Sequence, residues 1–183
     1  MRTFIAVDVS AGAIAKLQNE IISTAGWSPR DVKPVETQNL HFTLIFLGEK
    51  SDGDVDSIKS KLVQVQFDPF TLTYAGVGAF PKPASARVVW IGVDREGGQR
   101  LTALANDVVA RMAELGFSAD KPFSPHLTVF RAKGGPIQVS DITAKYQGRT
   151  FSSDLIDRVH LKKSDLTPSG PVYSNIYTVD AKK

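Results

Sequence analysis

The sequence reads HFTLIFLG at residues 41–48 and returns to a related segment, HLTVF, at residues 126–130. Both segments contain β-branched and aromatic residues, which favour strands. In a strand, residues two apart project from the same face, so each histidine points the same way as the threonine that follows it. The alternate residues are apolar and are expected to pack into a core behind each strand. The sequence therefore predicts two strands that each carry a histidine and a threonine on one face.

The same order of elements surrounds both segments: strand, helix, strand, helix, strand. Helices are predicted from apolar residues at helical spacing and from cap residues such as Ser51 and Gly116. The first half is expected to contain strands at 3–9, 41–48 and 70–80, with helices between Ser10 and Gly26 and over 55–65. The second half is expected to contain strands at 87–93, 126–130, within 151–163 and at 173–179, with helices over 101–115 and 139–146.

This internal similarity indicates a duplication, with two halves (approximately residues 1–80 and 87–183) that form one two-lobed α+β domain. Many α+β chains can be aligned to themselves this loosely, so secondary structure alone leaves the alternative open. The repeated histidine motif favours the duplication. Residues 80–86 are expected to form a turn-rich connector between the halves, and residues 133–136 and 166–171 are expected to form loops.

The composition narrows the functional classes. With 183 residues, 42% hydrophobic and 22% charged, the chain is expected to form one globular domain. The net charge of +3 agrees with a modestly basic cleft and gives no sign of a nucleic-acid-binding tail. Cysteine is absent, which excludes disulfides, thiol nucleophiles and thiolate metal ligands. The sequence shows no apolar run of membrane-spanning length and no signal peptide, so we expect a cytoplasmic protein without a membrane partner.

Two of the three histidines share the His-x-Thr pattern, which suits acid–base chemistry on a phosphodiester. Histidine titrates near neutral pH, so one imidazole can accept a proton from water while another protonates a leaving oxygen. Threonine hydroxyls can bind the non-bridging phosphate oxygens, where charge accumulates. If a pseudo-two-fold axis relates the halves, His41 and His126, with Thr43 and Thr128, face one cleft. A single histidine on a strand is usually structural, but the matched pair favours a shared active site over coincidence.

These segments resemble the two signature motifs of the two-histidine (2H) phosphoesterase superfamily. The motifs correspond to HFTLIFLG at 41–48 and HLTVFR at 126–131. The opening RTFIAVD at 2–8, RVVWIG at 87–92 and the segment 161–173 are similar to the RNA 2′,3′-cyclic phosphodiesterase branch, which is also called 2′–5′ RNA ligase. The resemblance spans nearly the whole chain. It implies a bilobed fold with two antiparallel sheets around a central cleft and helices on the outside.

The resemblance also implies an activity: hydrolysis of a terminal 2′,3′-cyclic phosphate to a 2′-phosphomonoester, without a metal or cofactor. Carried over, His41 is the proton donor, His126 is the proton acceptor and Arg131 binds the phosphate. The family often has a small residue before this arginine, where this chain has Phe130. Arg131 lies at an odd offset from His126, so it reaches the phosphate only if the strand bulges or ends there. The following Gly134-Gly135-Pro136 favours such an irregularity.

Other residues are weaker candidates. Phe80 and Tyr173, at loop edges, are candidates for stacking on an unpaired base. Trp90 is set in an apolar strand and is expected in the core. His160 has no threonine two residues on, so we interpret it as a strand residue without catalytic duty. The expected partner is RNA that ends in a 2′,3′-cyclic phosphate, tRNA fragments included, and the expected state is a monomer.

Three alternatives remain open. A 2′–5′ RNA ligase, or a hydrolase of another cyclic or 2′–5′ phosphodiester, would use the same two histidines, because ligation is the reverse reaction. A non-catalytic RNA-binding module would need a broad basic surface and would not need the histidines. A metallohydrolase would lose its activity in a chelator, although neither His41 nor His126 has a carboxylate at a spacing typical of a metal site.

Overall fold

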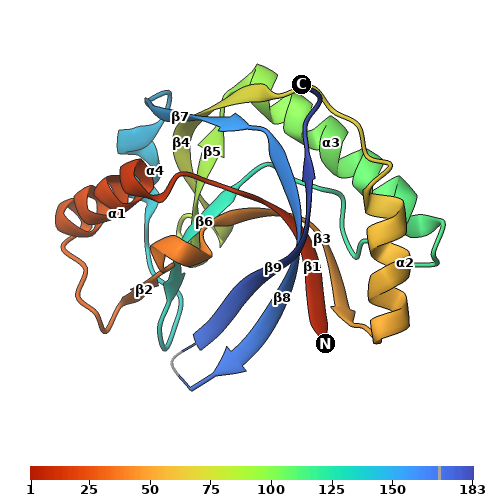
Figure 1. Cartoon of the computed structure of the whole chain (residues 1–183). Coiled ribbons are helices and arrows are strands. Elements are labelled where there is room, and N and C mark those ends of the chain that lie inside the picture. Colours follow the sequence, from red (N-terminus) through yellow and green to blue (C-terminus); the bar gives the residue numbers. More distant parts are fainter. Residues whose placement is uncertain (169) are drawn as a thin grey trace.

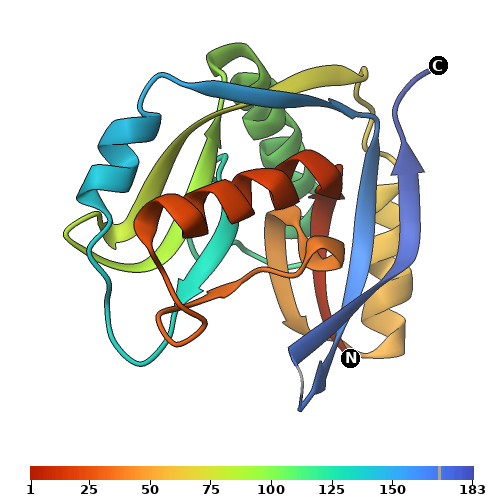
Figure 2. The same ribbon diagram turned by 90° about the vertical axis from the view of Figure 1, so that its left-hand side faces the viewer.

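The chain folds into two antiparallel sheets with α-helices on their outer sides (Figure 1, Figure 2). The structure, a computed structural model, describes residues 1–168 and 170–183. Ser169, in the expected loop 166–171, lies outside the described residues. The predicted α+β class with two antiparallel sheets is confirmed.

The first sheet has the strand order β3-β1-β8-β9. Its strands are β1 (Arg2–Asp8), β3 (His41–Glu49), β8 (Arg158–Thr167) and β9 (Gly170–Asp180). All neighbours pair antiparallel. Strand β1 is central, and the five residues between its ends are all buried. A strand with both faces covered is apolar along its length rather than alternating, which explains why the opening segment is a continuous apolar run.

The second sheet has the strand order β2-β6-β5-β4-β7. Its strands are β2 (Val32–Pro34), β4 (Phe70–Lys82), β5 (Ser85–Val93), β6 (Leu127–Ala132) and β7 (Thr150–Ile156). Here too every neighbouring pair is antiparallel. The predicted strands that carry the two histidine motifs, β3 and β6, thus belong to different sheets.

The helices flank the sheets, with α1 and α4 on one side of the molecule and α2 and α3 on the other (Figure 1). They are α1 (Ala11–Ala25), η1 (Thr37–Asn39, a 3-10 turn), α2 (Asp52–Leu62), α3 (Arg95–Ala113) and α4 (Ser140–Tyr146). Gly26 ends α1 in the left-handed conformation, and Ser51 and Asp54 form a reciprocal capping box on α2. None of the helices in the described part of the chain combines the length and the apolar character that crossing a membrane requires.

Each half of the chain completes a sheet of the other half. Strand β1 lies between β3 of its own half and β8 of the second half. Reciprocally, β5 lies between β6 of its own half and β4 of the first half. Buried side chains from both sheets and from the helices join in one hydrophobic cluster. The two lobes are therefore interlocked by an exchange of strands.

Several elements differ from the sequence-based expectation. The expected connector at 80–86 is the tip of a hairpin, because strand pairing continues from Phe80↔Val88 to Lys82↔Ser85 and leaves only two residues for the turn. Helix α3 begins earlier than its apolar stripe, since the Asp94 side chain accepts the N–H of Gly97 and caps it. Strand β2 and the turn η1 were not predicted. Both are too short for a periodic pattern.

Candidate active site

A cavity of about 460 Å³ holds both predicted His-Thr pairs. Its lining comes from β1, β3 and β9 of the first sheet and from β2 and β6 of the second. The predicted site residues that line it are His41, Thr43, His126, Thr128, Arg131 and Tyr173. The structure therefore brings the two motifs to one cavity, as a pseudo-two-fold arrangement requires. Their catalytic roles remain predictions.

The two histidines have matching backbone partners. His41 is the first residue of β3, and its Nδ1 lies 2.7 Å from the carbonyl oxygen of Asn39. His126 immediately precedes β6, and its Nδ1 lies 2.8 Å from the carbonyl oxygen of Ser124. Each acceptor is thus the carbonyl two residues before the histidine. The same local geometry fixes both rings.

These contacts determine the tautomer of each imidazole. A carbonyl only accepts, so Nδ1 carries the hydrogen and the neutral ring presents its Nε2 lone pair. In His41, Nε2 lies 3.0 Å from the Thr43 hydroxyl. In His126, Nε2 has no hydrogen-bond partner among the described residues. The Nε2 atom of His126 is therefore available to accept a proton.

Burial lowers the pKa of both histidines. For His41, desolvation is the largest cause, and the nearby charges of Lys162 and Arg131 lower the pKa further, while its carbonyl partner and Asp8 raise it. For His126, desolvation lowers the pKa and its carbonyl partner opposes the shift. Burial thus favours neutral imidazoles, and an anion in the cavity would raise both pKa values.

A bulge in β6 explains how Arg131 reaches the cavity. Trp90 pairs with Thr128 and its neighbour Val89 pairs with Phe130, so Val129 is an extra residue without a partner in this ladder. The extra residue reverses the parity of the strand. Arg131 therefore lines the cavity together with Thr128 instead of pointing away from it. The irregularity expected before Gly134 is present, and it begins earlier than the glycines.

Strand β3 contains the equivalent bulge. Ala6 pairs with Thr43 and Ile5 pairs with Ile45, which leaves Leu44 as the extra residue. As in β6, this residue follows the histidine by three positions. The bulge brings Phe46 to the cavity, where it is 48% exposed. Phe46 is thus the counterpart of Arg131, because each lies five residues after its histidine. Sequence reasoning missed Phe46, although the shared spacing was a usable signal.

Gln18 of α1 holds the bulge in β6. Its side chain is buried, and its Nε2 donates to the carbonyl oxygens of Val35 (2.9 Å) and Val129 (3.0 Å). The Val129 carbonyl also accepts the backbone N–H of Val35 (2.9 Å). A bulge frees backbone groups from the ladder, and buried groups need partners. Gln18 therefore stabilises the segment that directs Arg131.

The aromatic candidates lie in different places. Tyr173 lines the cavity and meets the rings of His41 (5.3 Å) and Phe4 (5.0 Å) edge to face. Phe80 packs edge to face on His126 at 4.9 Å and is 41% exposed. Trp90, expected in the core, is only half-buried and lies 6.0 Å from the ring of His126. The expectation for Trp90 was wrong because β5 turns this side chain toward the histidine.

His160 lies in a buried polar cluster beside the cavity. Its Nδ1 contacts the Thr178 hydroxyl at 2.9 Å, and its Nε2 lies 3.5 Å from the Asp8 carboxylate. Asp8 also forms an ion pair with Lys162 at 2.8 Å, and Lys162 donates to Asn175 at 2.6 Å. His160 does not line the cavity of the other two histidines. Its placement agrees with a structural role.

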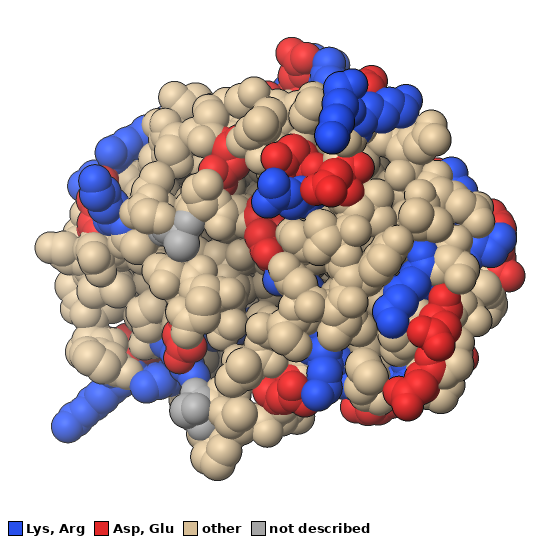
Figure 3. All heavy atoms as spheres, viewed as in Figure 1, with Lys and Arg blue, Asp and Glu red and all other residues tan. Residues whose placement is uncertain are grey.

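The charges around the cavity are sparse. Within residues 1–168 and 170–183, no three His, Asp or Glu side chains gather as metal ligands would. On the face shown in Figure 3, basic and acidic side chains are interspersed and do not form a continuous basic band. Two basic residues, Lys33 and Arg131, and the acidic Glu36 line the cavity, and the charge of the neighbouring Lys162 also acts on His41.

Comparisons of the sequence with known proteins find one family. The family model described as "LigT like Phosphoesterase" matches residues 7–90 and again residues 91–173. A relative from Archaeoglobus fulgidus, named RNA 2′,3′-cyclic phosphodiesterase, is 45% identical over 176 residues, which cover 96% of this chain and 98% of the relative. A relative of the same name from Thermotoga maritima is 33% identical over 179 residues, which cover 97% of this chain and 94% of the relative.

Comparisons of the fold agree. A crystal structure of a phosphoesterase superposes with a TM-score of 0.77 at 26% identity, over 100% of this chain and 98% of that one. The crystal structure of E. coli LigT complexed with 3′-AMP superposes with a TM-score of 0.76 at 26% identity, over the same shares. The similarity extends over the whole of both chains.

Proposed function

Because the chain belongs to the LigT-like phosphoesterase family, we propose that it hydrolyses the terminal 2′,3′-cyclic phosphate of RNA to a 2′-phosphomonoester. Relatives that cover nearly its whole length are named for this activity. The observation that carries the proposal is the matched setting of His41 and His126. Each ring is fixed by the carbonyl two residues before it, and both rings line one cavity.

Proton transfer follows from this setting. Nε2 of neutral His126 takes a proton from water as the water oxygen attacks phosphorus. The bond from phosphorus to the 3′ oxygen breaks, and protonated His41 donates its Nε2 proton to that oxygen. The products are a 2′-phosphate and a free 3′-hydroxyl, and the two histidines have exchanged protonation states. Each positioned acid or base contributes about 10²–10⁴-fold to the rate.

The phosphate is bound by the side chains that share the histidine faces. Thr43 and Thr128 can donate hydroxyl hydrogens to its non-bridging oxygens, and Arg131 supplies a charge-assisted partner. The negative charge of the bound phosphate raises the pKa of both histidines, which offsets the effect of burial. Binding therefore promotes the protonation that His41 needs as an acid.

We propose that the terminal nucleoside binds on the side of the cavity that carries the aromatic rings. Phe46 stacks on Phe4 at 5.8 Å with an interplanar angle of 5°, and Tyr173 stands across from them. Aromatic rings of this kind bind unpaired bases without strong sequence preference. Phe80 packs on His126 and is proposed to support that ring, with base stacking as its secondary role.

The substrate is RNA with a cyclic phosphate end, and tRNA fragments are included in the proposal. Both histidines come from one chain, so a monomer is sufficient for catalysis. Ligation to a 2′–5′ linkage would run through the same atoms in reverse. The net charge is only +3, and acidic and basic side chains are interspersed on the face drawn in Figure 3; both observations favour an end-processing enzyme over a module that binds RNA along a broad basic surface.

One experiment tests the function directly. The protein is incubated in excess chelator with an oligoribonucleotide that ends in a 2′,3′-cyclic phosphate, and the terminal group is identified by phosphorus NMR. We expect a 2′-phosphate, with the His126→Ala variant as the inactive control. A 3′-phosphate would reverse the assignment of the leaving oxygen, and turnover abolished by the chelator would contradict a mechanism based on the histidines alone.

A further inference from the structure

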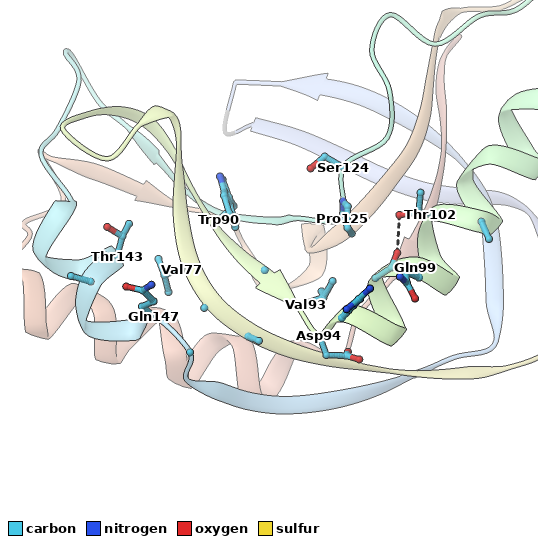
Figure 4. A pocket seen from close by; sticks show the side chains of 18 of the residues that line it. Val77, Trp90, Val93, Asp94, Gln99, Thr102, Ser124, Pro125, Thr143 and Gln147 are labelled. Atoms are coloured by element: carbon cyan, nitrogen blue, oxygen red, sulfur yellow. Dashed lines mark hydrogen bonds between the residues drawn. The ribbon is translucent and has the colours of Figure 1, made fainter.

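A second cavity, of about 990 Å³, adjoins the active site and has no part in the mechanism above (Figure 4). Its walls come from β4 and β5, from the first half of α3, from α4 and from the segment Ser124–Pro125. Trp90 stands between the α3 side and the α4 side. We call this cavity the Trp90 groove. Its volume lies at the upper end of the range of ligand sites, about 300–1,000 Å³.

The Trp90 groove borders the active site at Ser124. Ser124 lines both cavities, and its carbonyl oxygen holds the ring of His126. The rings of Trp90 and His126 lie 6.0 Å apart. The groove therefore begins beside the phosphate site, within reach of a flexible RNA chain that leaves the active-site cavity. The attacking water needs no cavity of this size, so the groove has space for another part of the substrate.

Trp90 is held as a flat platform. A Cβ atom at Gly78 would lie 2.1 Å from Cζ2 of Trp90, so the indole rests directly on the backbone of β4. The buried Nε1–H of Trp90 has no hydrogen-bond partner in the described part of the chain. Buried donors are nearly always paired, so this N–H marks a place where a further group would complete the structure.

The groove also offers unpaired polar side chains at both ends. Gln99 lies on α3 and Gln147 follows α4, and neither side chain forms a hydrogen bond with another described residue. Arg95 lines the α3 end and has no ion-pair partner among the described residues. The carboxylate of Asp94 already accepts the N–H groups of Thr73 and Gly97. An aromatic ring, two free amides and a free guanidinium match a base and a phosphate.

We propose that the Trp90 groove binds the single-stranded RNA on the 5′ side of the terminal nucleotide. The inference rests on the proposed function, because it assigns the part of the RNA that the 460 Å³ cavity does not hold. A base stacks at Trp90, and the amides and Arg95 bind its edge and an adjacent phosphate. The enzyme thereby distinguishes an RNA end from a free cyclic mononucleotide, although both react at the same two histidines.

The test fills the groove without touching the active site. Ala103→Trp places a bulky ring in the groove, and Ala110→Trp, on an exposed position of the same helix outside it, is the matched control. The substrates are a 2′,3′-cyclic mononucleotide and an oligoribonucleotide that ends in the same cyclic nucleotide. We expect Ala103→Trp to lower kcat/KM for the oligoribonucleotide by about tenfold, the size of one lost stacking interaction. The mononucleotide should be hydrolysed as before.

A second pair of variants tests the charge. Arg95→Gln should lower kcat/KM for the oligoribonucleotide by about tenfold to a hundredfold, the value of one hydrogen bond to a charged group. Arg100→Gln removes the same charge from the same helix but outside the groove, and it should change neither substrate. Equal losses on both substrates would show that the variants act through His126 and would overturn the proposal, as would no loss on either.

Two further results distinguish a failure of this proposal from a failure of the proposed function, and the upstream RNA from an acceptor strand. If the wild-type protein opened neither substrate, the proposed function would fail. The groove would still be tested by fluorescence anisotropy of a 5′-labelled oligoribonucleotide, which Ala103→Trp but not Ala110→Trp should weaken. If Ala103→Trp lowered activity only when a second RNA strand with a 5′-hydroxyl was added, the groove would bind that acceptor strand instead. That result would overturn the proposal.

Discussion

Replacing Gln18 by leucine tests whether α1 controls the active site through the bulge in β6. The substitution keeps the size of the side chain but removes both donors to Val35 and Val129. The Val129 carbonyl still accepts the N–H of Val35, so only the Val35 carbonyl loses the donor that Gln18 supplied. An unsatisfied buried group costs about 1–3 kcal/mol. For a chain of this length each kcal/mol lowers Tm by about 2–4 °C, so we expect a fall of roughly 2–12 °C.

The activity should fall because the bulge directs Arg131. A charge-assisted hydrogen bond contributes about 1.5–3 kcal/mol, and its partial loss should lower kcat/KM by about tenfold. In an Arg131→Ala background Gln18→Leu should lower kcat/KM much less, since the residue that it positions is gone. Asn19→Leu, on the exposed side of the same helix, is the matched control. Equal effects of Gln18→Leu in both backgrounds, or an unchanged Tm by circular dichroism, would refute this reasoning.

Three further predictions concern the histidines. His41→Ala and His126→Ala should each slow cyclic phosphate opening at least ~100-fold, and the double variant should lose less than the product of the two, as single-turnover rates would show. His160→Ala should lower Tm, because His160 is buried and contacts Thr178, but should leave the rate nearly unchanged; a rate as low as that of His126→Ala would mean that the wrong pair was chosen. The pH profile of kcat/KM should be bell-shaped, because the reaction needs a neutral proton acceptor and a donor that loses its proton as the pH rises. The maximum should lie below the ordinary histidine pKa of 6.5, because burial lowers the pKa of both histidines in the free protein. The maximum of kcat should lie at higher pH, since bound phosphate raises both values; a rate that rose steadily into alkaline pH would point instead to hydroxide or a metal-bound water.

Local patterns predicted the elements that hold the histidines. The strands at 41–48 and 126–130, the caps at Ser51 and Gly26 and the amphipathic stripe of α3 all follow from short-range rules. Each depends on residues close together in the sequence. The same rules also indicated that His-Thr pairs would share a face, and the structure places both pairs at one cavity.

Features that depend on distant partners could not be predicted in this way. Strands β4 and β8 each join a sheet of the other half, and this pairing depends on packing between the halves. The residues of either strand alone do not indicate which strand it pairs with. The acceptors of the two Nδ1 hydrogens are backbone carbonyls, which every residue carries, so Asn39 and Ser124 give no signal. Phe46 was missed because a regular strand would turn it away, and the bulge at Leu44 reverses that direction.

The exchange of β4 and β8 has a consequence for assembly. Each half carries one catalytic histidine but only part of the sheet that supports it, since β8 completes the sheet of His41 and β4 completes the sheet of His126. A half released from its companion would expose unpaired strand edges from both sheets to solvent. The covalent link at the tip of the β4–β5 hairpin is therefore a tether of two residues, and strand pairing on both sides holds the halves together. Cut at that tip, the two pieces should still recognise one another, as an obligate heterodimer with its active site at the interface.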